Sequence, residues 1–264
     1  FLVNAAMAAQ PATFGFADAG EAVRASFWMV AAWWAVFTLP MLLFVRESRA
    51  AEPLPLGPAV RAGWRELKET LRHVRADRTL LLFLLAYWFY IDGVNTVMKM
   101  AVDYGLALGF QQGTLIKALL LVQFVGFPAA LAFGLLGQRF GPRTGIMIAI
   151  CVYAAATVYA YFMSSESEFY ALAITVGLVQ GGIQSLSRSL YGRLVPPGKA
   201  GEFFGFYNMM GKAAAVLGPM LTGVTALLTR DSRLAILSLV ILFVIGGVLL
   251  SRVRLQPQLA GSSR

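Results

Sequence analysis

The sequence predicts an all-α membrane protein whose helices cross a bilayer several times. Hydrophobic residues make up 58% of the chain and charged residues 13%, whereas soluble domains are about 45–50% apolar and about 25% charged. The mean hydropathy is +0.69. Seven long apolar runs each approach the roughly 20 residues that a spanning helix needs. These observations exclude a soluble protein with a large core.

The first 45 residues are expected to be the end of an N-terminal helix bundle. Residues 1–10 are apolar and do not begin with methionine, which predicts the tail of a span that started earlier in a longer chain. Residues 27–45 form the first complete span, and its three tryptophans suit the membrane interface or helix packing. This region therefore supplies one and a half helices.

Residues 46–78 are the longest hydrophilic stretch and are expected to form a linker. Three prolines make its first part irregular. Apolar residues then recur at helical spacing with basic residues between them: Val60, Trp64, Leu67, Leu71 and Val74. The pattern predicts a basic amphipathic helix in the headgroup plane. A solvated helix, or one that packs on a partner, is the alternative.

Six spans follow the linker, before a polar tail at residues 252–264. Their predicted ranges are 79–105, 115–137, 145–163, 169–190, 203–228 and 234–251. Two spans contain a glycine close to a proline, at Gly126 and Pro128 and at Gly218 and Pro219. Proline removes a helical hydrogen bond, so both helices are expected to bend.

One further span contains glycines four residues apart, at Gly177 and Gly181. Small residues at this spacing let two helices approach closely in a membrane. The alternative is that the glycines expose backbone to a substrate.

Basic residues gather in the loops on the side of the linker. The opposite loops hold only Arg24, Arg230 and Arg233. By the positive-inside rule the linker and the C-terminal tail are cytoplasmic. We expect a multi-pass protein of a bacterial inner membrane. Topology thus explains the net charge of +9, and no nucleic-acid partner is expected.

The span 79–105 carries a stripe of polar residues on one helical face. Its members are Asp92, Asn95, Thr96, Lys99 and Asp103. Placing a charge in hydrocarbon costs roughly 2.5–3.5 kcal/mol on insertion scales, so this face must look onto protein or a wet cavity. A pathway for substrate or protons is the sharper interpretation, and a structural ion pair between helices is the alternative.

Three more spans carry polar residues, which we assign to the same pathway: Gln123, Gln180, Gln184, Asn208 and Lys212. The spans 145–163 and 234–251 hold no charge before their ends. Asp92 is the deep carboxylate. A carboxyl group shielded from water can bind and release protons near neutral pH, so Asp92 is the residue expected to couple protons to transport. A direct pair with Lys99 would weaken that role.

Charged residues between the spans define a predicted cytoplasmic gate, whose members are Arg139, Arg143, Arg188, Arg193 and Glu202. Charges at such a gate pair when it closes and separate when it opens. The alternative is that these residues only set membrane orientation, beside a rigid turn at Pro196 and Pro197.

The loop at residues 134–144, GLLGQRFGPRT, resembles the cytoplasmic signature of the major facilitator superfamily. Gly134, Arg139, Gly141 and Arg143 match the signature, and Gln138 replaces its usual aspartate. Longer stretches, including SLSRSL, VPPGK and EFFGFYN, resemble the vacuole-effluxer-like branch, which includes an autophagy-related amino-acid exporter.

The resemblance implies a twelve-helix fold in two six-helix halves. This chain would contain the end of helix 5, helix 6, the linker and helices 7–12. The cavity helices of the superfamily, 7, 8, 10 and 11, then coincide with the four polar spans. The missing N-terminal half is accordingly an expected partner, together with the lipid bilayer and a small-molecule substrate.

The function expected is secondary transport of a small solute, with amino acids among the solutes, by alternating access and proton coupling. A membrane scaffold or receptor is one alternative, and a membrane-embedded enzyme is another. The chain lacks HExxH, GxSxG and P-loop patterns, so we expect a non-enzyme without cofactors. A single Cys and a single His exclude disulfides and predict no metal site built on these ligands.

Overall fold

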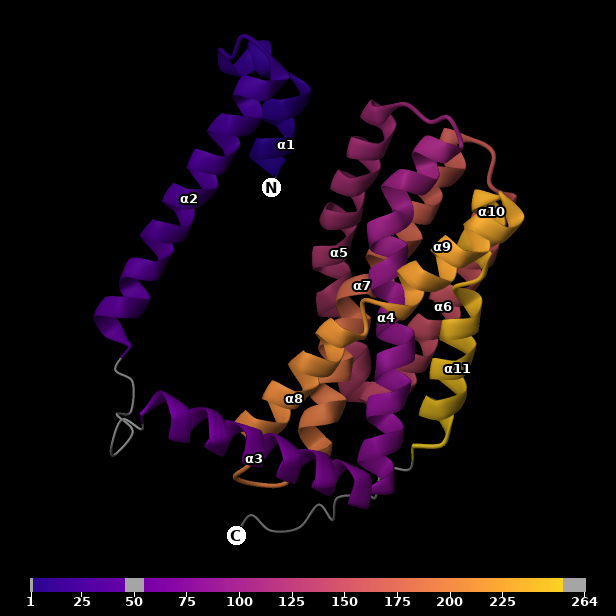
Figure 1. Ribbon diagram of the computed structural model, residues 1–264. Coiled ribbons are helices and arrows are strands. Elements are labelled where there is room, and N and C mark those ends of the chain that lie inside the picture. The colour runs from indigo at the N-terminus through magenta and orange to yellow at the C-terminus, as the bar shows by residue number, and fades with distance from the viewer. Residues whose placement is uncertain (1, 46–54, 254–264) are drawn as a thin grey trace. The chain divides into compact units, whose positions relative to one another are not determined.

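The computed structural model describes residues 2–45 and 55–253, and this part of the chain consists of helices and their connections (Figure 1). In chain order the helices are α1 (Leu2–Ala9), the 3-10 helix η1 (Pro11–Phe14), α2 (Ala19–Phe44), α3 (Leu56–Ala76), α4 (Arg78–Ala107), α5 (Gln112–Phe140), α6 (Pro142–Phe162), α7 (Glu166–Leu194), α8 (Ala200–Ala213), α9 (Leu217–Thr229), α10 (Ser232–Leu237) and α11 (Val240–Ser251).

Seven segments of the described chain are long and apolar enough to cross a membrane. Each contains or nearly coincides with one of the seven spans predicted from the sequence, so that prediction is confirmed. The protein is a multi-pass integral membrane protein. The chain divides into two compact units, Phe1–Arg61 and Ala62–Arg264. The predicted linker and tail lie partly outside the described residues, at 46–54 and 254–264.

The smaller unit contains the first complete span, α2. This helix begins eight residues before the predicted start because Asp18 caps it, accepting a hydrogen bond from the Glu21 amide at 2.7 Å. The Glu21 carboxylate in turn accepts from the Ala17 amide at 2.8 Å. Such a reciprocal pair satisfies amides that a helix start leaves without partners. The apolar side chains along α2 are mostly exposed, as a lipid-facing helix requires.

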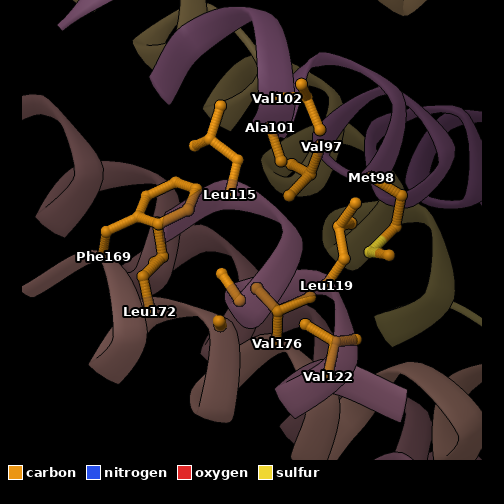
Figure 2. A pocket seen from close by; sticks show the side chains of 12 residues that line it. Val97, Met98, Ala101, Val102, Leu115, Leu119, Val122, Phe169, Leu172 and Val176 are labelled. Carbon is orange, nitrogen blue, oxygen red and sulfur yellow. The ribbon is translucent and has the colours of Figure 1, made fainter. Parts of the chain in front are cut away.

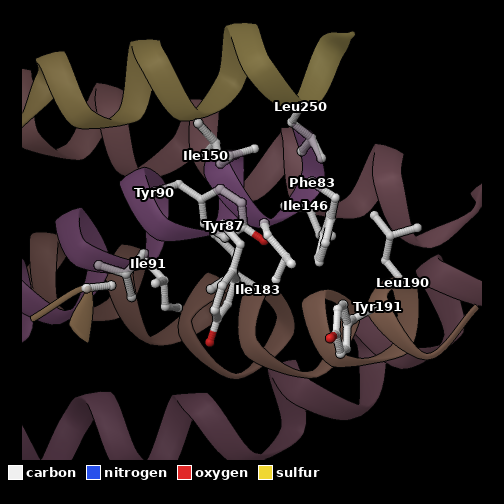
Figure 3. Close-up of a cluster of buried hydrophobic side chains, with 14 of the residues drawn as sticks. Phe83, Tyr87, Tyr90, Ile91, Ile146, Ile150, Ile183, Leu190, Tyr191 and Leu250 are labelled. Atoms are coloured by element: carbon white, nitrogen blue, oxygen red, sulfur yellow. The ribbon is translucent and has the colours of Figure 1, made fainter. Parts of the chain in front are cut away.

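The larger unit is organised around α4, which contacts every helix from α5 to α11 (Figure 1). Its buried residues Phe83, Tyr87 and Tyr90 pack with residues of α6, α7 and α11 in the main apolar cluster (Figure 3). The Tyr90 hydroxyl and Ser187 of α7 share a buried hydrogen bond of 2.7 Å. The helix that carries the stripe of polar residues, α4, is therefore the central helix of the larger unit.

Helices α5 and α7 pack closely through small residues. A Cβ atom at Gly177 would lie 3.1 Å from the carbonyl oxygen of Val122, and one at Gly181 would lie 2.8 Å from the Ala130 Cβ. Both values are shorter than ordinary carbon contacts. The close-packing interpretation of these two glycines is confirmed, and they are not left as bare backbone for a substrate.

One of the two predicted bends coincides with a broken helix. The predicted span 203–228 is divided at residues 214–216 into α8 and α9, directly before Gly218 and Pro219. By contrast, α5 runs without interruption through Gly126 and Pro128. A single proline removes only one hydrogen bond, which a helix tolerates when its flanking turns stay paired. The last span is also interrupted, between α10 and α11.

The C-terminal half of α3 packs on the larger unit. Thr70 and Val74 are buried, and Glu69 forms an ion pair with Lys199, in the connection between α7 and α8, at 3.1 Å. Trp64, one turn earlier than Lys68 on the same helix, keeps 59% of its surface exposed. This half of α3 therefore packs on its own chain, whereas Trp64 remains exposed. The location of the helix in the headgroup plane stays a prediction.

Acidification should loosen the attachment of α3. The hydrogen bond from Lys199 lowers the pKa of Glu69 below its ordinary value of 4.5. A carboxyl group with a lowered pKa stabilises the folded contact at higher pH, and the contribution disappears as the pH falls below 4.5 through the lowered pKa. A nitroxide label on Arg72→Cys, in a Cys151→Ser background, should become more mobile over this range.

Glu69→Gln should give the mobile signal at every pH, because the amide cannot pair with Lys199 as an anion. Glu66→Gln, on the exposed side of the same helix, is the matched control and should keep the pH dependence. A label whose mobility is the same in all three proteins would show that the ion pair does not hold α3.

Candidate functional site

Asp92 lies fully buried in the middle of α4, where its carboxylate is bound by two groups. One oxygen, Oδ2, accepts a hydrogen bond from the Gly218 amide at 2.9 Å. The other, Oδ1, accepts from the Thr96 hydroxyl at 3.4 Å. Asp92 and Thr96 are four residues apart, so both point from one face of α4 toward the start of α9.

The carboxylate of Asp92 caps the first turn of α9. Val216 occupies the N-cap position of α9 and offers no side-chain hydrogen bond to it, so the first amides of that helix lack a local acceptor. The contact from α4 supplies one. A negative charge at a helix N-terminus is also favoured by the helix dipole, typically by 0.3–1 kcal/mol and up to about 2 kcal/mol when partly buried.

Gly218 is required for this close approach. A Cβ atom at that position would collide with the Thr96 hydroxyl and lie 2.9 Å from the Asp92 carboxylate. One turn further along α9, Thr222 is buried and its hydroxyl donates to the Gly218 carbonyl at 3.1 Å. Sequence analysis predicted only a helix bend at Gly218 and Pro219. Nothing in that pair of residues indicated that Asp92 would contact the Gly218 amide.

The remaining residues of the α4 stripe are distributed differently. Asn95 is half-buried, whereas Lys99 and Asp103 are exposed. Lys99 forms no ion pair with Asp92, since the salt bridge found in the described chain is that of Glu69 with Lys199. The stripe therefore divides into a buried pair, Asp92 and Thr96, and a more accessible side.

A second group of predicted residues lies along the seam of α7 and α8. Arg188 donates a hydrogen bond from Nη2 to Oδ1 of Asn208 at 3.4 Å, and its guanidinium carbon lies 5.9 Å from the centre of the Phe204 ring. Gln184 precedes Arg188 by one turn on α7, and Lys212 follows Asn208 by one turn on α8. All four polar residues are exposed on the described chain. We call them the polar seam.

The polar seam carries two cations within membrane-spanning helices. Neither Arg188 nor Lys212 belongs to an ion pair among the described residues. Lys212 is in the last turn of α8, where a cation favours the negative end of the helix dipole. Exposing such groups to lipid is costly, so the surface that bears them is suited to water, an anionic ligand or another part of the protein.

Two predicted residues stand apart from the polar seam. Gln180 is half-buried on α7, and Gln123 is exposed on α5. The structure gives neither a side-chain hydrogen bond to the other predicted residues.

The larger unit contains a partly open apolar cavity. Side chains of α4, α5 and α7 surround a cavity of about 50 Å³, with Leu119, Phe169 and Val176 among them (Figure 2). No predicted site residue lines it. Its lining side chains are all apolar, whereas a buried water needs two to four polar partners, so the cavity does not suit a polar solute. The polar seam lies instead on surface that the described chain leaves uncovered, and α5 and the α8–α9 span are the least buried helices of the larger unit.

The predicted gate residues are not brought into one network. Arg139 lies over the ring of its neighbour Phe140, and Arg143 donates to the Ser251 carbonyl at the end of α11. Arg188 belongs to the polar seam, while Arg193 and Glu202 are exposed. The ion pair that the structure does show on this side, between Glu69 and Lys199, was not predicted. The sequence hinted at this ion pair only through the basic residues of the loop around Lys199 and the acidic residue at position 69.

Comparison with known proteins gives a consistent assignment. A family model described as "Vacuole effluxer Atg22 like" matches residues 3–258. The MFS-type transporter YxiO of Bacillus subtilis is 44% identical over 230 residues, which cover 87% of this chain and 53% of the relative. Autophagy-related protein 22-1 of Aspergillus niger is 28% identical over 225 residues, 76% of this chain and 36% of the relative.

Autophagy-related protein 22 of Yarrowia lipolytica is 26% identical over 252 residues, 84% of this chain and 43% of the relative. The chain thus spans about half the length of these relatives, or less. The family match covers nearly every residue of the helices described above, from α1 to α11. The chain belongs to the vacuole effluxer Atg22-like family.

Proposed function

We propose that this chain is part of a secondary transporter that moves a small solute across a membrane by alternating access. The polar seam carries the proposal. Two cations with no ion-pair partner among the described residues, together with two amides, occupy one surface of helices that are long and apolar enough to cross a bilayer. Such groups survive at bilayer depth by facing a wet path. The name of the Bacillus subtilis relative, an MFS-type transporter, and the effluxer description of the family support the same function.

The chain corresponds in this proposal to the C-terminal half of a twelve-helix protein. The larger unit supplies six membrane spans, from α4 to α11. Its least covered helices, α5 and the α8–α9 span, would face the N-terminal half across the transport path. The connection that contains α3 would lie on the cytoplasmic side of a bacterial inner membrane, because it carries the excess of basic residues.

The solute of the proposed transporter carries a carboxylate, and amino acids are the class to test first. The guanidinium of Arg188 has five donors, and the bond to Asn208 uses one of them. The guanidinium lies over the Phe204 ring at cation–π distance, and its remaining donors can bind an anion bidentately. Lys212, one turn from Asn208, adds a second positive charge on the same surface.

Protons are the coupling ion in this proposal, and Asp92 is the residue that carries them. Its carboxylate is the buried acid at the centre of the unit, and it contacts the one span that is broken into two helices of similar length. Neutralising the carboxylate would remove the charge that caps α9. Proton binding would therefore alter the contact between α4 and the α8–α9 span.

Uptake by the complete transporter in liposomes tests the proposal. Radiolabelled amino acids, sugars and dipeptides would be offered with an imposed pH gradient, with and without an uncoupler. We expect uptake of an amino acid that the uncoupler abolishes. Arg188→Gln should reduce it by about tenfold or more, the loss of one charge-assisted bond to the carboxylate. Arg65→Gln, on the exposed side of α3, should leave it unchanged.

The chain described here should show no flux when reconstituted alone, because its polar seam then lacks the opposite wall of the path. Flux from the isolated chain would contradict the half-transporter proposal. Absence of gradient-driven uptake of every solute by the complete protein would favour a scaffold or receptor instead.

A further inference from the structure

A pocket of about 440 Å³ opens at one end of the larger unit, between the first turn of α4 and the last turn of α11. It is lined by Arg78, Thr79 and Leu82 from α4 and by Ser251 and Arg252 from the end of α11. It lies at the opposite end of α4 from the apolar cavity and shares no residue with the polar seam. The transport proposal gives it no role.

The pocket is positively charged and contains one hydroxyl donor. Arg78 and Arg252 provide two guanidinium groups, and Thr79 provides a hydroxyl group. The Ser251 hydroxyl instead donates to the Val248 carbonyl at 2.7 Å. A third guanidinium, that of Arg143, reaches the same turn of α11 by donating to the Ser251 carbonyl. None of these three arginines forms an ion pair with another described residue.

The carboxylate that precedes Arg78 in the chain caps α4. Asp77 precedes α4 and accepts hydrogen bonds from the amides of Thr79 and Leu80 at 2.8 and 3.1 Å. Its Oδ1 thus caps α4, and among the described residues Asp77 neither lines the pocket nor forms an ion pair with Arg78. The three guanidinium groups consequently lack an internal counterion in the described chain, and they favour an anion from outside.

The position of the pocket indicates which anion. Arg78 and Arg252 flank the ends of two membrane spans, so the pocket lies at the depth of the lipid headgroups. Leu82, one turn further into α4, gives it an apolar inner edge. Guanidinium groups bind phosphate oxygens bidentately, and basic pockets between spans on this side of a membrane suit anionic headgroups.

We propose that the pocket between α4 and α11 binds a phosphate group, supplied by an anionic phospholipid of the surrounding leaflet. A soluble phosphate would offer the same chemistry without acyl chains. The two sources of phosphate can be distinguished by experiment. A lipid would be retained through membrane extraction, whereas a soluble phosphate would bind in detergent without any lipid present.

Native mass spectrometry of the full protein from nanodiscs tests the lipid source. The probes are phosphatidylglycerol and phosphatidylcholine in equal amounts. We expect phosphatidylglycerol to be retained at least about fivefold more often. The double variant Arg78→Gln/Arg252→Gln should weaken that retention by about tenfold. Arg65→Gln/Arg72→Gln removes the same charge from the exposed face of α3 on the same side, and it should keep the preference.

Thermal unfolding in detergent with inorganic phosphate, at matched ionic strength with chloride, tests the soluble source. A rise in the melting temperature that the pocket variant loses would support the pocket with a soluble phosphate as its ligand. If the glutamine variant does not fold, Arg78→Lys/Arg252→Lys keeps the charge and should show an intermediate loss. The proposal is overturned if wild type shows neither a lipid preference nor a phosphate shift, or if the α3 control loses either effect equally.

Discussion

Replacing Asp92 with leucine should destabilise the larger unit by about 2–3 kcal/mol, the cost of leaving a buried amide without its acceptor. The Gly218 amide donates to the Asp92 carboxylate at 2.9 Å, and leucine offers no oxygen in its place. The start of α9 would then have no cap. Unfolding in mixed detergent micelles with increasing dodecyl sulfate measures the change in free energy.

Asp92→Asn is the matched control, because it keeps an oxygen acceptor while removing the charge. Asparagine caps helices about as well as aspartate, so the free energy of unfolding should stay within about 1 kcal/mol of wild type. In the complete transporter this variant should retain solute exchange but lose uptake driven by a pH gradient. Normal proton-driven uptake in Asp92→Asn would restrict Asp92 to a capping role.

Replacing Gly181 with leucine should separate α5 from α7 and destabilise the fold by about 3 kcal/mol or more. Even a methyl group there would lie 2.8 Å from the Ala130 Cβ, and the next nearest atom is the Gly126 carbonyl oxygen. Backbone and a methyl on Cα cannot move aside as a flexible side chain would, so the helices must shift. Overpacking of a close interface typically costs 1–3 kcal/mol, occasionally more.

Gly134→Leu, on α5, provides the comparison for Gly181→Leu. No atom lies within 4 Å of a Cβ built at Gly134, so the stability of this variant should change by less than about 1 kcal/mol. Dodecyl sulfate titrations of both proteins, monitored by circular dichroism, measure the difference. Equal stability of the two variants would show that the close contact of α5 and α7 is not important for folding.

The number and place of the spans could be predicted from the sequence because apolar length decides them. A run such as residues 145–163 has no other stable environment than a bilayer or a protein interior. The close packing of α5 and α7 could also be predicted, because Gly177 and Gly181 have the spacing typical of helix contacts in membranes. The start of α2 was missed by eight residues, because the decisive group, Asp18, is polar and precedes the apolar run.

The contacts of the candidate site could not be predicted from the sequence. A helical stripe gave Asp92 and Thr96 a common face, but nothing local indicated that the face meets the amide of Gly218, which follows 126 residues later. The same holds for Glu69 and Lys199, separated by 130 residues. Long-range pairs depend on how helices are arranged around α4, and periodicity along one helix carries no information on that arrangement.

The division of one span into α8 and α9 has a consequence for the thickness of the membrane. The two helices and their joint cover 30 residues, about 45 Å of helix at 1.5 Å per residue, against a hydrocarbon core of about 30 Å. A straight rod of that length could respond to a thinner bilayer only by leaning as a whole. A span divided into two helices can instead change the angle between α8 and α9. This span can therefore adapt to hydrophobic mismatch without tilting the neighbouring helices.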